Sequence, residues 1–221
     1  MTQEISRRGL LRRAAAGAGT TALAVVGAST VLAPAAAASP ATETTQGTAG
    51  SEKRRRTSVN GWETVTSVDS GGPVWTQPVV GTGCEVPMRV GAVATVLVHV
   101  IRRFHYEVRA LAEGDVIGWR SPSTVPAATP ENNQASGTAV AILPGSYPPG
   151  ARGGYFPNQL AAVRKITEEC DGVVRWGGDE NHPYEALFSI DVPPGDPRLP
   201  ALAATIRHRE ELAGTGAGKP R

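Results

Sequence analysis

One pattern constrains the fold most: short β-rich runs, each closed by glycine or proline, lie between stretches with helical periodicity. The first helical stretch is expected to begin at Pro87 and to bury apolar residues spaced three and four apart, namely Val93, Val96, Leu97, Val100, Ile101 and Phe104. A second helix is expected over residues 156–170, where Asp171-Gly172 ends it, and a last helix from about Pro200.

The runs between these helices are short and rich in β-branched and aromatic residues, which is typical of strands. The expected extended segments are residues 106–111, 116–119, 138–143, 173–176 and 188–192. Residues 121–133 contain three prolines and are expected to form a loop. Helices at both ends with short strands between them predict an α+β fold, with a small antiparallel sheet flanked by helices.

The N-terminus is typical of an export signal. Ser6-Arg7-Arg8-Gly9-Leu10-Leu11-Arg12-Arg13 precedes a weakly hydrophobic stretch, and Ala36-Ala37-Ala38 fits a small-residue cleavage pattern. A membrane-spanning helix is the alternative, but the stretch is rich in glycine and poor in large aliphatic residues. Residues 1–38 are therefore expected to be a twin-arginine signal peptide. The mature chain would be secreted or extracytoplasmic, at the cell envelope, with no stable membrane span after processing.

The flanks of the folded part are polar. Residues 39–60 are expected to be a flexible leader and residues 213–221 a disordered tail, which leaves 61–212 as one domain. The run Lys53-Arg54-Arg55-Arg56 fits attachment to anionic wall polymers, a late processing site, or simply a solvated linker. The chain has 22 basic and 20 acidic residues, and loss of residues 1–38 removes four arginines and one glutamate. The net charge is then near −1, which argues against a nucleic-acid partner.

The chain has two cysteines, Cys84 and Cys170. In an exported protein an isolated pair most simply forms one disulfide, and this pair would close a long loop. Two buried free thiols and a shared metal site are the alternatives. A zinc site is the poorer of these, because no histidine lies near either cysteine in the sequence.

Two segments carry a resemblance to a known family. They are Asn132-Asn133-Gln134-Ala135-Ser136-Gly137-Thr138-Ala139-Val140-Ala141-Ile142 and Ala186-Leu187-Phe188-Ser189-Ile190. They resemble the metal-site segments of the zinc D-alanyl-D-alanine carboxypeptidases, the hedgehog-like peptidoglycan metallopeptidases. That family writes them as Ser-Asn-His-Ala-Ser-Gly-Thr-Ala-x-Asp and Met-His-Phe-x-Ile. The order of the surrounding pieces extends the resemblance over about residues 112–198, and it implies the fold of that family.

The residues that bind zinc in that family are replaced here. Its ligands are the first His, the Asp seven residues later and the second His, and a carboxylate three residues before the second His is the base. The corresponding positions are Gln134, Ala141, Leu187 and Tyr184. A catalytic zinc needs three protein ligands, whereas these side chains offer one neutral amide oxygen and otherwise no donor. The resemblance therefore implies no metal ligands, no catalytic base and no expected cofactor.

Other residues are weaker candidates for a site. Asp179, His182 and Glu185 cluster before the second segment, and they fit either a displaced zinc site or a polar surface loop. Arg120 corresponds to an arginine that the family uses to hold the substrate carboxylate, although a loop arginine commonly faces water. Ser136, inside the first segment, is the second candidate for substrate binding.

Three functions fit these observations. The first, which we expect, is an exported and catalytically inactive carboxypeptidase-like domain that binds peptidoglycan stem peptides or an envelope protein. The second is an active zinc D-alanyl-D-alanine carboxypeptidase with rearranged ligands. The third is a structural or interaction domain without a ligand groove. All three share one fold, so the residues of the site must separate them.

Overall fold

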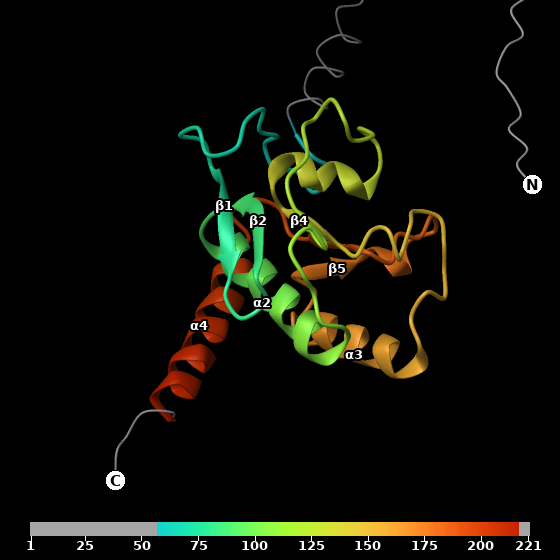
Figure 1. The fold of residues 1–221 in the computed structure, drawn as a ribbon. Coiled ribbons are helices and arrows are strands. Elements are labelled where there is room, and N and C mark those ends of the chain that lie inside the picture. Colours follow the sequence, from blue (N-terminus) through green and yellow to red (C-terminus); the bar gives the residue numbers. More distant parts are fainter. Residues whose placement is uncertain (1–56, 217–221) are drawn as a thin grey trace, which may run out of the picture. The chain divides into compact units, whose positions relative to one another are not determined.

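The computed structural model describes residues 57–216, which form two antiparallel sheets, three α-helices and two 3₁₀ helices (Figure 1). In chain order the elements are β1 (Val74–Val79), β2 (Cys84–Arg89), α2 (Ala92–Glu107), β3 (Val116–Ile117), η1 (Pro130–Ser136), β4 (Ala139–Ile142), α3 (Pro157–Glu168), β5 (Val174–Trp176), η2 (Gly177–Asp179), β6 (Leu187–Ile190) and α4 (Arg198–Gly216). The expected signal peptide, most of the leader with its basic run, and residues 217–221 of the tail lie outside the described residues.

The larger sheet has the order β3-β4-β6-β5, with every neighbouring pair antiparallel. Its two central strands, β4 and β6, are buried along their whole length. Strands covered on both faces read as continuous apolar runs, which explains why Ala139–Ile142 shows no alternation. The predicted α+β class with a small antiparallel sheet is confirmed.

Helix α2 occupies the centre of the structure and buries all six residues of the predicted apolar stripe. It contacts α3, α4, the two hairpin strands and β4. The predicted start at Pro87 is wrong, because Pro87 lies in β2 and the helix begins at Ala92. The predicted strand at residues 106–111 is also wrong. There α2 continues to Glu107, and the amides of Val108 and Arg109 still bond to the carbonyl of Phe104.

The hairpin β1–β2 explains how Pro87 fits into a strand. Pro87 pairs with Thr76 of β1, and its carbonyl accepts a hydrogen bond from the Trp119 amide on the opposite side. In a strand, the nitrogen and the carbonyl of one residue point to the same side. Those of Pro87 point away from β1, so the missing N–H removes no hydrogen bond from the β1–β2 pairing. Cys84, Val86 and Met88 alternate with it and are buried in the core.

The predicted disulfide is wrong. Cys84 and Cys170 are both buried and both free. Cys84 lies at the start of β2, not at the start of a helix, and its Sγ is 3.2 Å from the carbonyl oxygen of Ala112. Burial raises the pKa of the Cys170 thiol to about 12. The two thiols therefore behave as small buried groups of the core.

The packed part of the chain begins before Gly61. Thr57 forms an isolated β-bridge with Glu63, and Ser58 is buried. The side-chain amide of Asn60 donates to Thr138 Oγ1 (2.8 Å) and to the Ile190 carbonyl (2.7 Å). The polar composition of residues 57–60 favours a flexible leader, because composition alone does not reveal hydrogen-bond partners that are distant in the sequence. At the other end, α4 extends to Gly216, into the range predicted as tail.

Candidate functional site

The positions that the sequence resemblance aligns with zinc ligands lie next to one another. Ala141 on β4 is opposite Leu187 on β6, and on its other side it is opposite Ile117 of β3. Gln134, in η1, donates through Nε2 to the carbonyls of Ile117 and Gly118, at 3.0 Å and 2.9 Å. The sheet register and this amide thus bring Gln134, Ala141 and Leu187 into one neighbourhood.

These three residues cannot hold a metal ion. Each is only 1% exposed, and Ala141 and Leu187 contribute only hydrocarbon groups to the core. The Nε2 of Gln134 is occupied by backbone carbonyls, and its buried Oε1 has no hydrogen-bond partner among the described atoms. One amide oxygen does not replace two imidazoles and a carboxylate, so the residues present do not fit a zinc ion.

Tyr184 stands at the position that the sequence resemblance aligns with a catalytic base. Its carbonyl accepts a hydrogen bond from the Leu187 amide, which holds the backbone of Tyr184 close to that of Leu187. Burial raises the pKa of the Tyr184 phenol; the charge of Glu131 adds to this rise and that of Arg120 opposes it. The phenol is therefore protonated at neutral pH and does not act as a general base there.

Arg120 lies on the other side of the same neighbourhood. Its backbone amide bonds to the Gln134 carbonyl at 3.4 Å, and its guanidinium donates to the Thr124 carbonyl at 2.9 Å. Arg120 as a whole is partly exposed, and its guanidinium makes no other hydrogen bond within residues 57–216. It therefore has donors left for a carboxylate.

Ser136, the second predicted substrate contact, lies inside the protein. It is fully buried, and its hydroxyl bonds to the Asn133 carbonyl and to Thr138 Oγ1, at 2.9 Å and 2.8 Å. These bonds fix the end of η1 against the start of β4. Because Ser136 has no exposed surface, its hydroxyl cannot contact a substrate in this structure.

The residues of the predicted displaced metal site do not converge. Asp179 pairs with Arg164 at 2.5 Å, and both oxygens of the buried Glu185 carboxylate accept amide hydrogens, from Gly153 and Gly154, at 2.8 Å each. His182 lies beside Gly150 instead. In the described part of the chain, no three His, Cys, Asp or Glu side chains are grouped as metal ligands are.

Sequence reasoning missed the role of Glu185 in the fold. A Cβ on Gly154 would lie 2.9 Å from Glu185 Oε2 and 2.7 Å from Tyr147, so no side chain fits there. The two successive glycines bring their amides close to the carboxylate, where charge-assisted hydrogen bonds form. The Gly153-Gly154 pair was the available signal.

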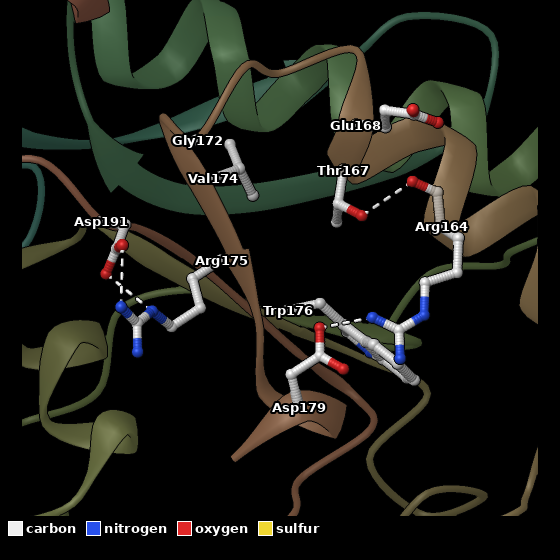
Figure 2. Close-up of a pocket in the computed structure, with 9 residues that line it drawn as sticks. All are labelled: Arg164, Thr167, Glu168, Gly172, Val174, Arg175, Trp176, Asp179 and Asp191. Carbon is white, nitrogen blue, oxygen red and sulfur yellow. Dashed lines mark hydrogen bonds and ion pairs between the residues drawn. The ribbon is translucent and has the colours of Figure 1, made fainter.

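A surface groove of about 410 Å³ runs along β5, the edge strand of the larger sheet (Figure 2). At one end Arg175 pairs with Asp191 at 2.8 Å, and it also bonds to Glu180. At the other end Arg164 lies over the ring of Trp176, 4.7 Å from its centroid, and pairs with Asp179. Both arginines of the groove are thus engaged, and they neutralise the carboxylates around them.

No helix formed by residues 57–216 combines the length and apolar character that a membrane span requires. Comparisons of the chain with protein-family models, curated proteins and solved structures found no match.

Proposed function

We propose that this protein is an exported, catalytically inactive carboxypeptidase-like domain that binds cell-wall stem peptides rather than cleaving them. One observation carries the proposal. The three positions corresponding to zinc ligands lie together, as such a site requires, yet they hold buried side chains that cannot coordinate a metal. The Tyr184 phenol, whose pKa is raised, in place of a carboxylate base supports the same conclusion.

The binding half of the proposal rests on Arg120. Arg120 is partly exposed, its guanidinium is held by a single carbonyl, and its backbone amide bonds to the Gln134 carbonyl. A peptide that ends in D-alanyl-D-alanine presents a carboxylate, which a guanidinium can bind through two parallel hydrogen bonds. Without a metal-bound water near the scissile carbonyl, the peptide would be held and released unchanged.

The first experiment measures zinc in the purified chain from Ser39 onward, after incubation with zinc and desalting. We expect far less than one zinc per chain, and no release of D-alanine from a stem peptide. One zinc per chain together with hydrolysis that a chelator abolishes would overturn the proposal and support the active alternative.

The second experiment titrates the protein with a peptide ending in D-alanyl-D-alanine. We expect saturable binding that Arg120→Gln weakens by about tenfold or more, because a charge-assisted hydrogen bond is lost. Arg207→Gln is the matched control, since this exposed arginine on α4 also makes one hydrogen bond, to Thr95. Absence of binding by the unaltered protein would contradict the binding role and leave a structural domain.

A further inference from the structure

Asn60-Gly61 is the single Asn-Gly pair in the sequence. Asparagine is chemically labile before glycine, because no Cβ shields the backbone nitrogen that follows it. Once a solvent base removes its proton, that nitrogen attacks the side-chain carbonyl carbon of the asparagine, and the amide nitrogen leaves as ammonia. Water then opens the cyclic imide to give aspartate or isoaspartate. The pair therefore carries the chemistry of a spontaneous modification, and the fold decides whether it reacts.

The fold requires both residues of this pair. Gly61 has a φ of 84°, in the left-handed region that favours glycine. Asn60 uses both ends of its side-chain amide. Its Nδ2 donates to Thr138 Oγ1 and to the Ile190 carbonyl, at 2.8 Å and 2.7 Å. Its Oδ1 accepts the Ser58 hydroxyl at 2.6 Å, a combination of donor and acceptor that a carboxylate does not offer.

The same contacts oppose deamidation. The Gly61 amide donates to the Ser58 carbonyl at 2.9 Å, so the nitrogen that must attack is engaged. The two bonds from Asn60 Nδ2 hold the side chain against the ends of β4 and β6, and they must break before its amide carbon can turn onto that nitrogen. The reaction therefore requires a local opening of residues 57–62, and its rate should follow the population of the opened state.

The product of deamidation does not fit the same place. A carboxylate at residue 60 accepts hydrogen bonds and donates none, so the Ile190 carbonyl would lose its donor and face a negative charge. Isoaspartate would also lengthen the main chain just before Trp62. The Nε1 of Trp62 bonds to the Val192 carbonyl at 2.8 Å, and its ring lies under the Arg89 guanidinium. Both contacts depend on where the backbone places Trp62.

We propose that Asn60-Gly61 is a deamidation site that stays unreactive while residues 57–62 are packed against the domain, and that its conversion releases this segment irreversibly. The fold thus protects the one residue pair whose chemical change would undo the attachment of the segment. This chemistry is independent of the function proposed above.

The first test compares the mature chain, from Ser39 onward, in its folded state and in guanidinium chloride at the same mildly alkaline pH. Peptide mass spectrometry measures deamidation at Asn60, and enzymatic methylation detects isoaspartate. We expect the folded protein to react at least about tenfold more slowly, because only the opened fraction is reactive. Equal rates would overturn the protection, and no reaction in the unfolded chain would overturn the site.

Trp62→Phe tests the opening itself. It removes the bond to the Val192 carbonyl and leaves the Asn-Gly pair intact, so deamidation of the folded protein should become about threefold faster or more, with no change in the unfolded chain. Trp75→Phe is the matched control, since the Trp75 ring also makes one bond, to the Gly72 carbonyl, outside residues 57–62. The same acceleration in both variants would overturn control by this segment.

Asn60→Asp tests the release, because it creates the aspartate product directly. We expect chymotrypsin to cut after Trp62 at least about tenfold faster in this variant than in the unaltered protein, since cleavage follows the opened population. Asn181→Asp, at an exposed position, should leave that rate unchanged. Equal protection of Trp62 in Asn60→Asp and in the unaltered protein would show that deamidation does not release the segment and would overturn that half of the proposal.

Discussion

Gly118 lies where the chain leaves no room for a side chain. A Cβ at this position would be 2.1 Å from the Pro87 carbonyl oxygen and 2.7 Å from Val86 Cγ1. The neighbouring Trp119 amide bonds to that same carbonyl, and the carbonyl of Gly118 accepts the Gln134 amide. This glycine therefore joins the hairpin, the end of β3 and η1.

Gly118→Ala is expected to destabilise the protein by at least about 1–3 kcal/mol, because the methyl group would meet backbone atoms that cannot move aside cheaply. Gly145→Ala is the matched control, since a Cβ there meets nothing within 4 Å. Chemical denaturation of both variants measures the difference. Equal stability of the two would show that the hairpin can shift away from β3.

At the candidate site, the sequence reveals the identity of the side chains but not their hydrogen bonds or their burial. The replacements at Gln134, Ala141 and Leu187 are visible in the sequence as side chains without suitable donor atoms. The bonds from the Gln134 amide to Ile117 and Gly118 are not, because they depend on how η1 packs against β3. The burial of Ser136 depends on the same packing.

The elements whose apolar pattern is local were predictable, and those that depend on distant partners were not. The stripe of α2 follows from a period of 3.6 residues, so its buried face was predicted correctly. Hairpin β1–β2 was missed because Pro87 favours a helix start and the pairing with Thr76 is not visible in either strand alone. Residues 57–60 were assigned to a leader for a similar reason, since Asn60 bonds to residues some 80 and 130 positions away.

Asn60→Ala tests this N-terminal segment. It removes the three hydrogen bonds of the side-chain amide, to Ser58, Thr138 and Ile190, and we expect a loss of about 1–3 kcal/mol because the Ile190 carbonyl then lacks its donor. Asn181→Ala, at an exposed position, should change stability by less than about 0.5 kcal/mol. Thermal unfolding of the two variants gives the comparison, and a harmless Asn60→Ala would return these residues to the flexible leader.

Arg103 joins two helices through Glu107 on α2 and Glu169 at the end of α3. Hydrogen bonding to Arg103 lowers the pKa of both carboxyl groups, so this contribution to stability is present above their usual pKa of 4.5 and is lost as pH falls below it. All three side chains are partly exposed, which keeps the contribution small.

Arg103→Gln should therefore cost about 1 kcal/mol near neutral pH, and this difference from the unaltered protein should shrink in acid. Urea denaturation between about pH 7 and about pH 3.5 measures it. Arg207→Gln, which removes a hydrogen bond to Thr95 but no ion pair among the described residues, serves as the control and should show no such acid dependence. A cost for Arg103→Gln that stays constant with pH would assign its effect to packing.

The whole molecule, although its N-terminus is typical of an exported protein, has both cysteines reduced and inside the core. The stability of the described domain thus comes from packing around α2 and not from a covalent link. The sequence favoured the disulfide because its N-terminus is typical of exported proteins, in which cysteines commonly pair. The position of Cys84 in the hairpin, which the sequence did not reveal, separates it from Cys170.

We expect two alkylated cysteines when the unreduced protein is unfolded and treated with iodoacetamide, and an unchanged melting temperature in the presence of a reductant. In the folded state Cys170 should react very slowly, because it is buried and its pKa of about 12 leaves almost no thiolate. Mass spectrometry counts the adducts. Alkylation that requires prior reduction would demonstrate a disulfide.

The pairing of Ala141 with Leu187 across β4 and β6 limits how this protein could evolve toward metal binding. A histidine at 187 alone would place an imidazole against a methyl group, and an aspartate at 141 alone would bury a carboxylate without a partner. Each first step would lower stability before any ion could compensate for it. A path of single substitutions would therefore lose stability at its first step, so metal binding would require several positions to change together.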